Sequence, residues 1–158
     1  LFDTVYVSLY KYFGAPYGAI LAGTSAFVGG MYHDRRMFGS GLPSTYMAAG
    51  LALKGTEGFE ARFASAMAQA RELFERINRL PGIRIRTFEH GSNIFPAELD
   101  AHVDAEGFMD ALRHYRVFVY PDDAEPDRIH LTVNISILRQ TNDELVRAFQ
   151  DALTRSGR

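Results

Sequence analysis

The 158-residue sequence contains no cysteine, which excludes disulfide bonds, thiol catalysis and thiolate metal sites. No apolar run approaches the roughly 20 residues that a membrane-spanning helix needs. The first residues also lack the basic and apolar segments of a signal peptide. A net charge of −2 provides no basic surface of the kind that binds nucleic acid. We therefore expect neither a membrane nor a nucleic-acid partner, and a cytoplasmic location is the default expectation.

Lysine is almost absent as well, because only Lys11 and Lys54 among the 17 basic residues are lysines. The others are arginines, whose guanidinium stays protonated and cannot attack a carbonyl group. An arginine-rich genome is sufficient to explain the count. Even so, any Schiff-base chemistry would have to use one of these two lysines. Lys54 precedes a glycine at a predicted helix end, where its charge suits the helix dipole, and we expect it to be solvated.

The first third of the sequence predicts two strands, at residues 4–9 and 19–22, with a Gly/Pro turn between them. A helix from Thr24 towards Arg36 and another from Pro43 to about Leu53 follow. Two strands are too few for an independent sheet, and such apolar strands need cover on both faces. The pattern leaves two alternatives open: the strands end a larger sheet whose earlier strands are absent, or they join the sheet downstream.

The rest of the sequence begins with a long amphipathic helix, residues 57–80, whose apolar residues recur at steps of three and four. After it, the pattern gives a strand, a strand, a helix, a strand, a strand and a helix. This order predicts a compact α+β unit with helices on one face of a largely antiparallel sheet. The predicted elements are residues 83–88, 92–99, 104–114, 117–120 and 128–135, then a helix with a Thr141–Glu144 capping box.

Residues 8–11, Ser-Leu-Tyr-Lys, with the following Gly/Pro turn and apolar strand, resemble the lysine region of type I pyridoxal-phosphate (PLP) enzymes. Residues 35–41, Arg-Arg-Met-Phe-Gly-Ser-Gly, are similar to the basic residue and glycine cluster of threonine aldolases and related β-eliminating lyases. The long helix and the terminal α+β unit match that family's small domain in order and size. The resemblance covers the whole chain, but only about the C-terminal half of a complete family member.

The resemblance implies an α/β fold, namely the C-terminal half of the type I PLP-dependent transferase-like fold with its α+β small domain. Residues 1–55 would be the edge of the PLP-binding large domain, and residues 56–158 the bridging helix and small domain. The absent half would supply the carboxylate for the ring nitrogen, the group stacked on the ring and part of the phosphate cradle. Active sites of this family lie at a dimer interface, so a homodimer or tetramer is expected.

The resemblance also assigns roles to three residues near the start of the chain. Lys11 would carry PLP as a Schiff base and later shuttle protons, and its aromatic neighbours would desolvate the amine and favour the neutral form. The alternative for Lys11 is a surface lysine whose aliphatic stem packs while its amine stays in water. Ser8 would hydrogen-bond the cofactor phosphate, with an ordinary strand serine as an equal alternative. Arg36 would face the cofactor pocket, and the competing interpretation is a solvated arginine at a helix end.

Two positions depart from the family pattern. Threonine aldolases carry Met-Arg after the glycine cluster, whereas this sequence has Leu42-Pro43. Where the small domain usually supplies an arginine that binds the substrate carboxylate, the alignment places His130. Arg128 lies two residues away on the same strand face and would serve after a small register shift; a solvated edge arginine is the alternative. The departures leave the substrate, and aldolase activity itself, open.

We therefore expect part of a PLP-dependent amino-acid lyase that either cleaves the Cα–Cβ bond of a β-hydroxy amino acid or eliminates a β substituent. One alternative is a catalytically inactive fragment or half-enzyme that needs an N-terminal partner chain. Another, from a different class, is a non-enzymatic α+β binding module. No metal site is expected, because no two of the histidines have metal-ligand spacing on one helix. The five histidines are His33, His90, His102, His114 and His130.

Overall fold

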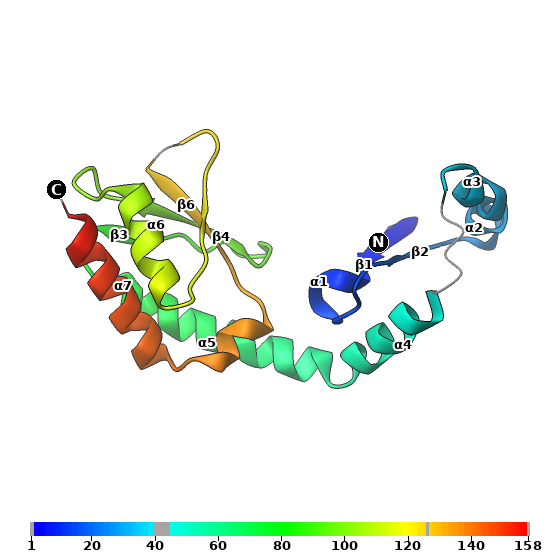
Figure 1. Ribbon diagram of the computed structural model, residues 1–158, viewed down its shortest axis with the longest axis horizontal. Helices are drawn as coiled ribbons and strands as arrows, with labels where there is room; N and C mark the ends of the chain where they lie inside the picture. The colour runs from blue at the N-terminus through cyan, green and yellow to red at the C-terminus, as the bar shows by residue number, and fades with distance from the viewer. Residues whose placement is uncertain (1, 40–44, 126, 158) are drawn as a thin grey trace. The chain divides into compact units, whose positions relative to one another are not determined.

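The structure is a computed structural model that describes residues 2–39, 45–125 and 127–157. The chain divides into two compact units, Leu1–Ala61 and Arg62–Arg158 (Figure 1). None of the helices in the described ranges has the length and apolarity that a bilayer span requires. Each unit is described by itself below.

The first unit starts with an antiparallel hairpin of β1 (Thr4–Ser8) and β2 (Ala19–Gly23). The helical turn α1 (Leu9–Tyr12) follows β1 directly, so Lys11 lies in this turn. The predicted strand over residues 4–9 is therefore one residue too long. The chain bends here because the Leu9 N–H donates to the carbonyl of Gly18 over 2.9 Å. Gly18 itself has a φ of 104°, which favours glycine.

The hairpin is uncovered on both faces. Directly paired residues of an antiparallel ladder share a face, so Val5 lies beside Ala22, and Tyr6 lies beside Leu21. Val5 is 44% exposed on one face, while Tyr6 and Leu21 are 65% and 44% exposed on the other. Among the described residues, both strands therefore lack the cover that such apolar strands need. Joining the downstream sheet is excluded, because β1 and β2 form a separate two-stranded sheet.

Helices follow the hairpin. Thr24 caps α2 (Ser25–Gly29), as predicted, with its hydroxyl accepting from the Phe27 N–H over 3.2 Å. The single helix predicted up to Arg36 is divided into α2 and α3 (Met31–Met37) by two adjacent glycines, which are poor helix formers. The helix predicted from Pro43 corresponds to α4 (Thr45–Thr56). Pro43 itself, Leu42 and the glycine cluster from residue 40 onward lie outside the described residues.

The turn that carries Lys11 packs against α4. Ala15, Ala48 and Ala52 are buried there, with Leu9 and Phe13 packed against them. A Cβ atom added at Gly55 would lie 2.0 Å from the carbonyl oxygen of Phe13. Only glycine therefore allows α4 to approach the backbone beyond Lys11 this closely.

The second unit has the predicted order of elements. Its four-stranded sheet has the order β3-β4-β6-β5, and every neighbouring pair is antiparallel. The long helix α5 (Phe59–Ile77) leads into this unit. The remaining elements are β3 (Ile83–Ile85), β4 (Ile94–Leu99), α6 (Ala105–His114), β5 (Tyr120–Pro121), β6 (Arg128–Thr132), a 3-10 helix (Ile135–Arg139) and α7 (Asn142–Ser156).

One face of this sheet forms the core. Alternate residues along β3, β4 and β6 are buried, while those between them are at least partly exposed. Helices α6 and α7 pack side by side, with the rings of Phe108 and Phe149 5.9 Å apart (Figure 1). The predicted caps are confirmed: Asp104 caps α6, and Thr141 and Glu144 form the capping box of α7. The prediction of helices on one face of an antiparallel sheet is therefore confirmed.

Several strands of this unit are shorter than predicted. The strand predicted at residues 117–120 is reduced to β5, because Arg116 has a φ of 59° and the Val117 N–H still bonds Leu112 at the end of α6. The strand predicted at residues 128–135 ends at Thr132, and Asn134 then caps the 3-10 helix. The strand predicted at residues 83–88 ends at Ile85.

The tight packing at Gly55 leads to a prediction about the stability of this region. Gly55→Ala should force α4 away from Phe13 and lower the opening free energy of this region by about 1–3 kcal/mol, as overpacking does. Hydrogen exchange of peptides from residues 9–13 and 45–56 should become correspondingly faster. The matched control is Gly50→Ala in the same helix, where an added Cβ meets nothing within 4 Å. This control should stabilise α4 by about 0.5–1 kcal/mol, and equal effects of the two variants would contradict the packing argument.

Candidate functional site

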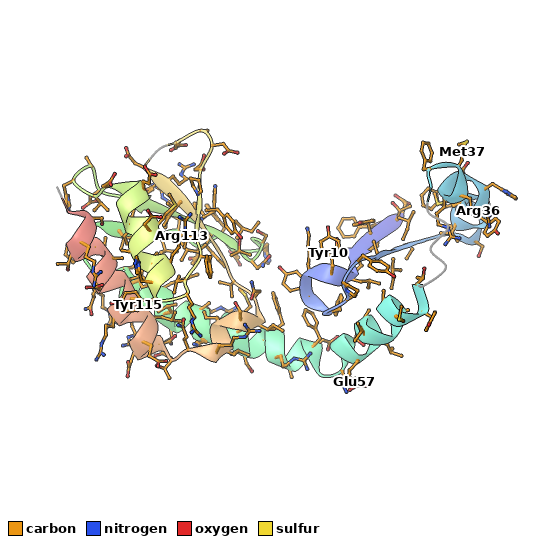
Figure 2. The ribbon with its side chains drawn as sticks, viewed as in Figure 1. Tyr10, Arg36, Met37, Glu57, Arg113 and Tyr115 are labelled. Carbon is orange, nitrogen blue, oxygen red and sulfur yellow. The ribbon has the colours of Figure 1, made fainter. Side chains whose placement is uncertain are left out.

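Lys11 lies in α1 with its side chain exposed. Among the described residues, no hydrogen bond or ion pair reaches its amine. Its neighbour Tyr10 is 51% exposed, and Phe13 packs edge-on against Phe59 with ring centroids 4.9 Å apart (Figure 2). The predicted shielding of Lys11 by aromatic neighbours is therefore wrong for the described residues. The exposed side chain fits the alternative of a surface lysine in the part of the chain that the structure describes.

Ser8 lies three residues before Lys11. It occupies the N-cap position of α1, yet its side chain makes no capping hydrogen bond. Its side chain is half-buried, and its backbone is extended because Ser8 is also the last residue of β1. Ser8 and Lys11 are therefore close in the sequence, and no contact between their side chains is found among the described residues.

Arg36 is placed differently. Its Nη1 donates to the hydroxyl of Tyr32 over 3.0 Å, and its guanidinium carbon lies 5.6 Å from the centre of the Tyr32 ring. Both contacts stay within α3, and no contact with Ser8 or Lys11 is found among the described residues. Figure 2 shows Arg36 on α3, away from Tyr10 on α1. The described geometry fits the alternative of a solvated helix arginine.

Arg128 and His130 lie on the face of β6 opposite the core, as their two-residue spacing predicts. Both side chains reach the carboxylate of Asp122, which follows β5. The distance to its Oδ2 is 2.9 Å from His130 Nε2 and 3.8 Å from Arg128 Nη1. The structure therefore brings the two predicted substrate residues together and adds Asp122. Asp122 was not identified as a site residue from the sequence.

The carboxylate of Asp122 is held in place, and its side chain is only 13% exposed. Its Oδ1 accepts hydrogen bonds from the backbone N–H of Ala124 over 2.8 Å and of Glu125 over 3.2 Å. The bond from Ala124, together with those from Glu125 and His130, lowers the pKa of Asp122 below its ordinary value of 3.8, although desolvation opposes the shift. Asp122 thus carries its charge at neutral pH.

Two polar atoms of this cluster lack partners. The Nε of Arg128 and the Nδ1 of His130 are buried, and neither has a hydrogen-bond partner among the described residues. Arg128 is otherwise engaged, since its Nη2 lies 2.7 Å from the Oε2 of Glu125. Buried polar atoms are normally hydrogen-bonded, so the Nε of Arg128 is a donor with unused hydrogen-bonding capacity among the described residues. Glu125, like Asp122, was not identified from the sequence.

Comparison with known proteins gives a family match. A family model for beta-eliminating lyases matches residues 1–99. No curated protein matches the chain. Among solved structures, a putative aromatic amino acid β-eliminating lyase/threonine aldolase from Exiguobacterium sp. 255-15 is 24% identical with a TM-score of 0.75, over 98% of this chain and 45% of its own.

Two other solved structures extend this comparison. A putative L-allo-threonine aldolase from Listeria monocytogenes EGD-E is 25% identical, with a TM-score of 0.74, over 96% of this chain and 45% of its own. An ornithine aminotransferase from Toxoplasma gondii, whose active site holds PLP at partial occupancy, is 14% identical with a TM-score of 0.63 over 98% of this chain and 37% of its own. The chain therefore spans less than half the length of each of these proteins. Its mixed α/β fold is that of type I PLP-dependent enzymes.

The lowered pKa of Asp122 predicts a pH dependence of stability. Because the folded state binds the Asp122 proton more weakly than the unfolded state, this group stabilises the fold above its ordinary pKa of 3.8, and that contribution is lost as the pH falls through the lower folded pKa. Urea unfolding should therefore show wild type more stable than Asp122→Asn near pH 6, with the difference shrinking in acid. Asp123→Asn removes the same charge from the same loop and is the control. A difference for Asp122→Asn that does not change with pH would contradict this assignment.

Proposed function

Because the chain belongs to the beta-eliminating lyase family, we propose that it contributes Lys11 to the active site of a PLP-dependent amino-acid lyase of the threonine-aldolase type. The observation that carries the proposal is the exposed amine of Lys11, which has no partner among the described residues and lies three residues after Ser8, whose hydroxyl makes no capping hydrogen bond. The reaction would cleave the Cα–Cβ bond of a β-hydroxy amino acid or eliminate a β substituent.

The residues around Lys11 fit the cofactor in the parts that this chain can supply. PLP needs a primary amine that can condense with its aldehyde and donors for its phosphate. Lys11 meets the first need, and Ser8 meets part of the second. Bound PLP supplies an electron sink for a bond broken at the substrate α-carbon. Lys11 would hold the cofactor aldehyde before substrate arrives and move a proton at the substrate afterwards, while Ser8 would donate to the phosphate.

The second unit would contribute the substrate-binding residues. An amino-acid carboxylate needs a guanidinium that offers two parallel N–H donors. Arg128 has a buried Nε without an acceptor, which supports this role. His130 is held through Nε2 by Asp122 at 2.9 Å and lies on the same strand face. We propose Arg128 as the main carboxylate ligand and His130 as its neighbour on the substrate side.

Further polypeptide would complete the site. Both faces of the β1–β2 hairpin expose apolar side chains, including Tyr6 at 65% and Ile20 at 53%, and an isolated two-stranded hairpin is only marginally stable in water. We propose that the N-terminal half of the type I fold covers this hairpin and shields Lys11 from water, as part of the same protein or as a partner chain. A homodimer or tetramer would then form the complete site. By themselves, residues 1–158 would bind PLP weakly or would not turn over substrate.

Covalent labelling tests the lysine assignment. PLP is added to the protein, the mixture is reduced with borohydride, and the modified peptide is identified by mass spectrometry. Lys11 should be labelled in preference to Lys54, which lies in the last turn of α4. Lys11→Arg keeps the positive charge but cannot condense with an aldehyde, so it should abolish the main label. Lys54→Arg is the matched control and should leave it unchanged. Ser8→Ala should weaken labelling at low PLP by about ten- to hundredfold, the usual loss for a hydrogen bond to a charged group.

Equal labelling of Lys11 and Lys54 would favour the non-enzymatic binding module, because two exposed lysines react alike when neither is part of a site. Strong and selective labelling that appears only after an N-terminal partner chain is added would favour the half-enzyme.

A further inference from the structure

The guanidinium of Arg128 contacts two carboxylates that differ in how firmly they are held. Asp122 is 13% exposed and its Oδ1 is fixed by two backbone N–H groups, whereas the Glu125 side chain is 56% exposed. The short contact is nevertheless the one to Glu125, 2.7 Å from Nη2, against 3.8 Å from Nη1 to Asp122. The firmly held carboxylate of Asp122 is therefore the more distant of the two. The exposed carboxylate of Glu125 is the one that binds the Nη2 donor.

The contact with Glu125 uses only half of the available donor pair. The Nε–H and the adjacent Nη2–H of an arginine point the same way and form a fork that matches the two oxygens of one carboxylate. Here Glu125 binds Nη2, while Nε remains buried without an acceptor among the described residues. A ligand carboxylate that bridged both donors would make one more charge-assisted hydrogen bond than Glu125 does.

The local backbone allows such an exchange without unfolding the loop. The N–H of Arg128 donates to the carbonyl of Glu125, and the N–H of Asp122 donates to the carbonyl of Arg128, each over 3.0 Å. These two hydrogen bonds hold the main chain of Asp122, Glu125 and Arg128 in place. Replacing Glu125 then requires rotation of its exposed side chain, which frees the Nη2 donor beside Nε.

We propose that Glu125 is an exchangeable internal carboxylate that occupies Arg128 until the carboxylate of an amino-acid ligand replaces it, while Asp122 remains in place and positions the guanidinium. The inference rests on the proposed function in taking the ligand to be an amino acid. Glu125 thereby sets a threshold for binding, because a ligand that cannot bridge both Nε and Nη2 gains nothing over the contact it displaces. Compact α-carboxylates pass this threshold, and ligands without a carboxylate leave Arg128 paired with Glu125.

The test follows the Nε–Hε signal of Arg128 by NMR during a titration with sodium acetate, with sodium chloride at equal ionic strength as the reference. The signal is assigned by its loss in Arg128→Lys. Glu125→Gln keeps the side-chain shape and removes the competing charge. It should tighten acetate binding by about three- to fivefold, the range expected for a half-exposed ion pair. Asp123→Asn removes one negative charge from the same loop and should change acetate binding by less than about twofold.

Equal tightening in Glu125→Gln and Asp123→Asn would overturn the proposal, because the effect would then be general electrostatics. A Glu125→Gln protein with an unchanged backbone spectrum and no acetate response at Arg128 would overturn it as well. Glu125→Ala provides a second variant if the first is not folded. Because this titration needs neither PLP nor Lys11, it can fail while selective labelling of Lys11 succeeds, and the reverse is also possible.

Discussion

The close approach of α4 to the turn after α1 determines where Lys11 lies. Gly55 admits the backbone of Phe13, and the buried residues Ala15, Ala48 and Ala52 fill the small space around it. The core is made of alanines because larger side chains would separate the helix from the turn. This contact fixes the end of the turn whose other end is tied by the bond from Leu9 to Gly18. Lys11 is thus held between two backbone anchors although its own side chain has no described partner.

The same unit shows why placing a lysine is different from activating it. Condensation with an aldehyde requires a neutral amine, and removal from water is one of the usual ways to favour that form. The described residues leave Lys11 exposed and the hairpin beside it uncovered on both faces. For the proposed Schiff-base role, this chain fixes the position of Lys11, whereas exclusion of water would have to come from a structure that covers β1 and β2. A single cover would meet both requirements, since the apolar strands and the amine are adjacent.

Local signals in the sequence predicted the parts of the fold that depend on local physics. Thr24, Asp104 and the Thr141–Glu144 box were identified as caps because a capping residue acts on backbone groups within one turn. The apolar run of β2 predicted that this strand needs cover, but the run alone could not show whether the described residues supply that cover. The strand expected at residues 117–120 is shorter than predicted. The positive φ of Arg116 and the hydrogen bond from the Val117 N–H to Leu112 extend the end of α6 into this segment.

The predicted site shows the same division. Arg128 and His130 lie on one strand face because this relation follows from strand periodicity, whereas Ser8 ends β1 and Lys11 lies in α1, so no single periodicity relates them. Asp122 and Glu125 were missed because their roles depend on how the loop between β5 and β6 folds back, which no periodicity encodes. Yet it is this loop that decides what Arg128 can do. Two carboxylates already surround the guanidinium, so its affinity for a third is set by the weaker competitor. The family pattern points to the position of His130, two residues from Arg128, and any ligand of Arg128 would have to compete with the two carboxylates that this loop supplies.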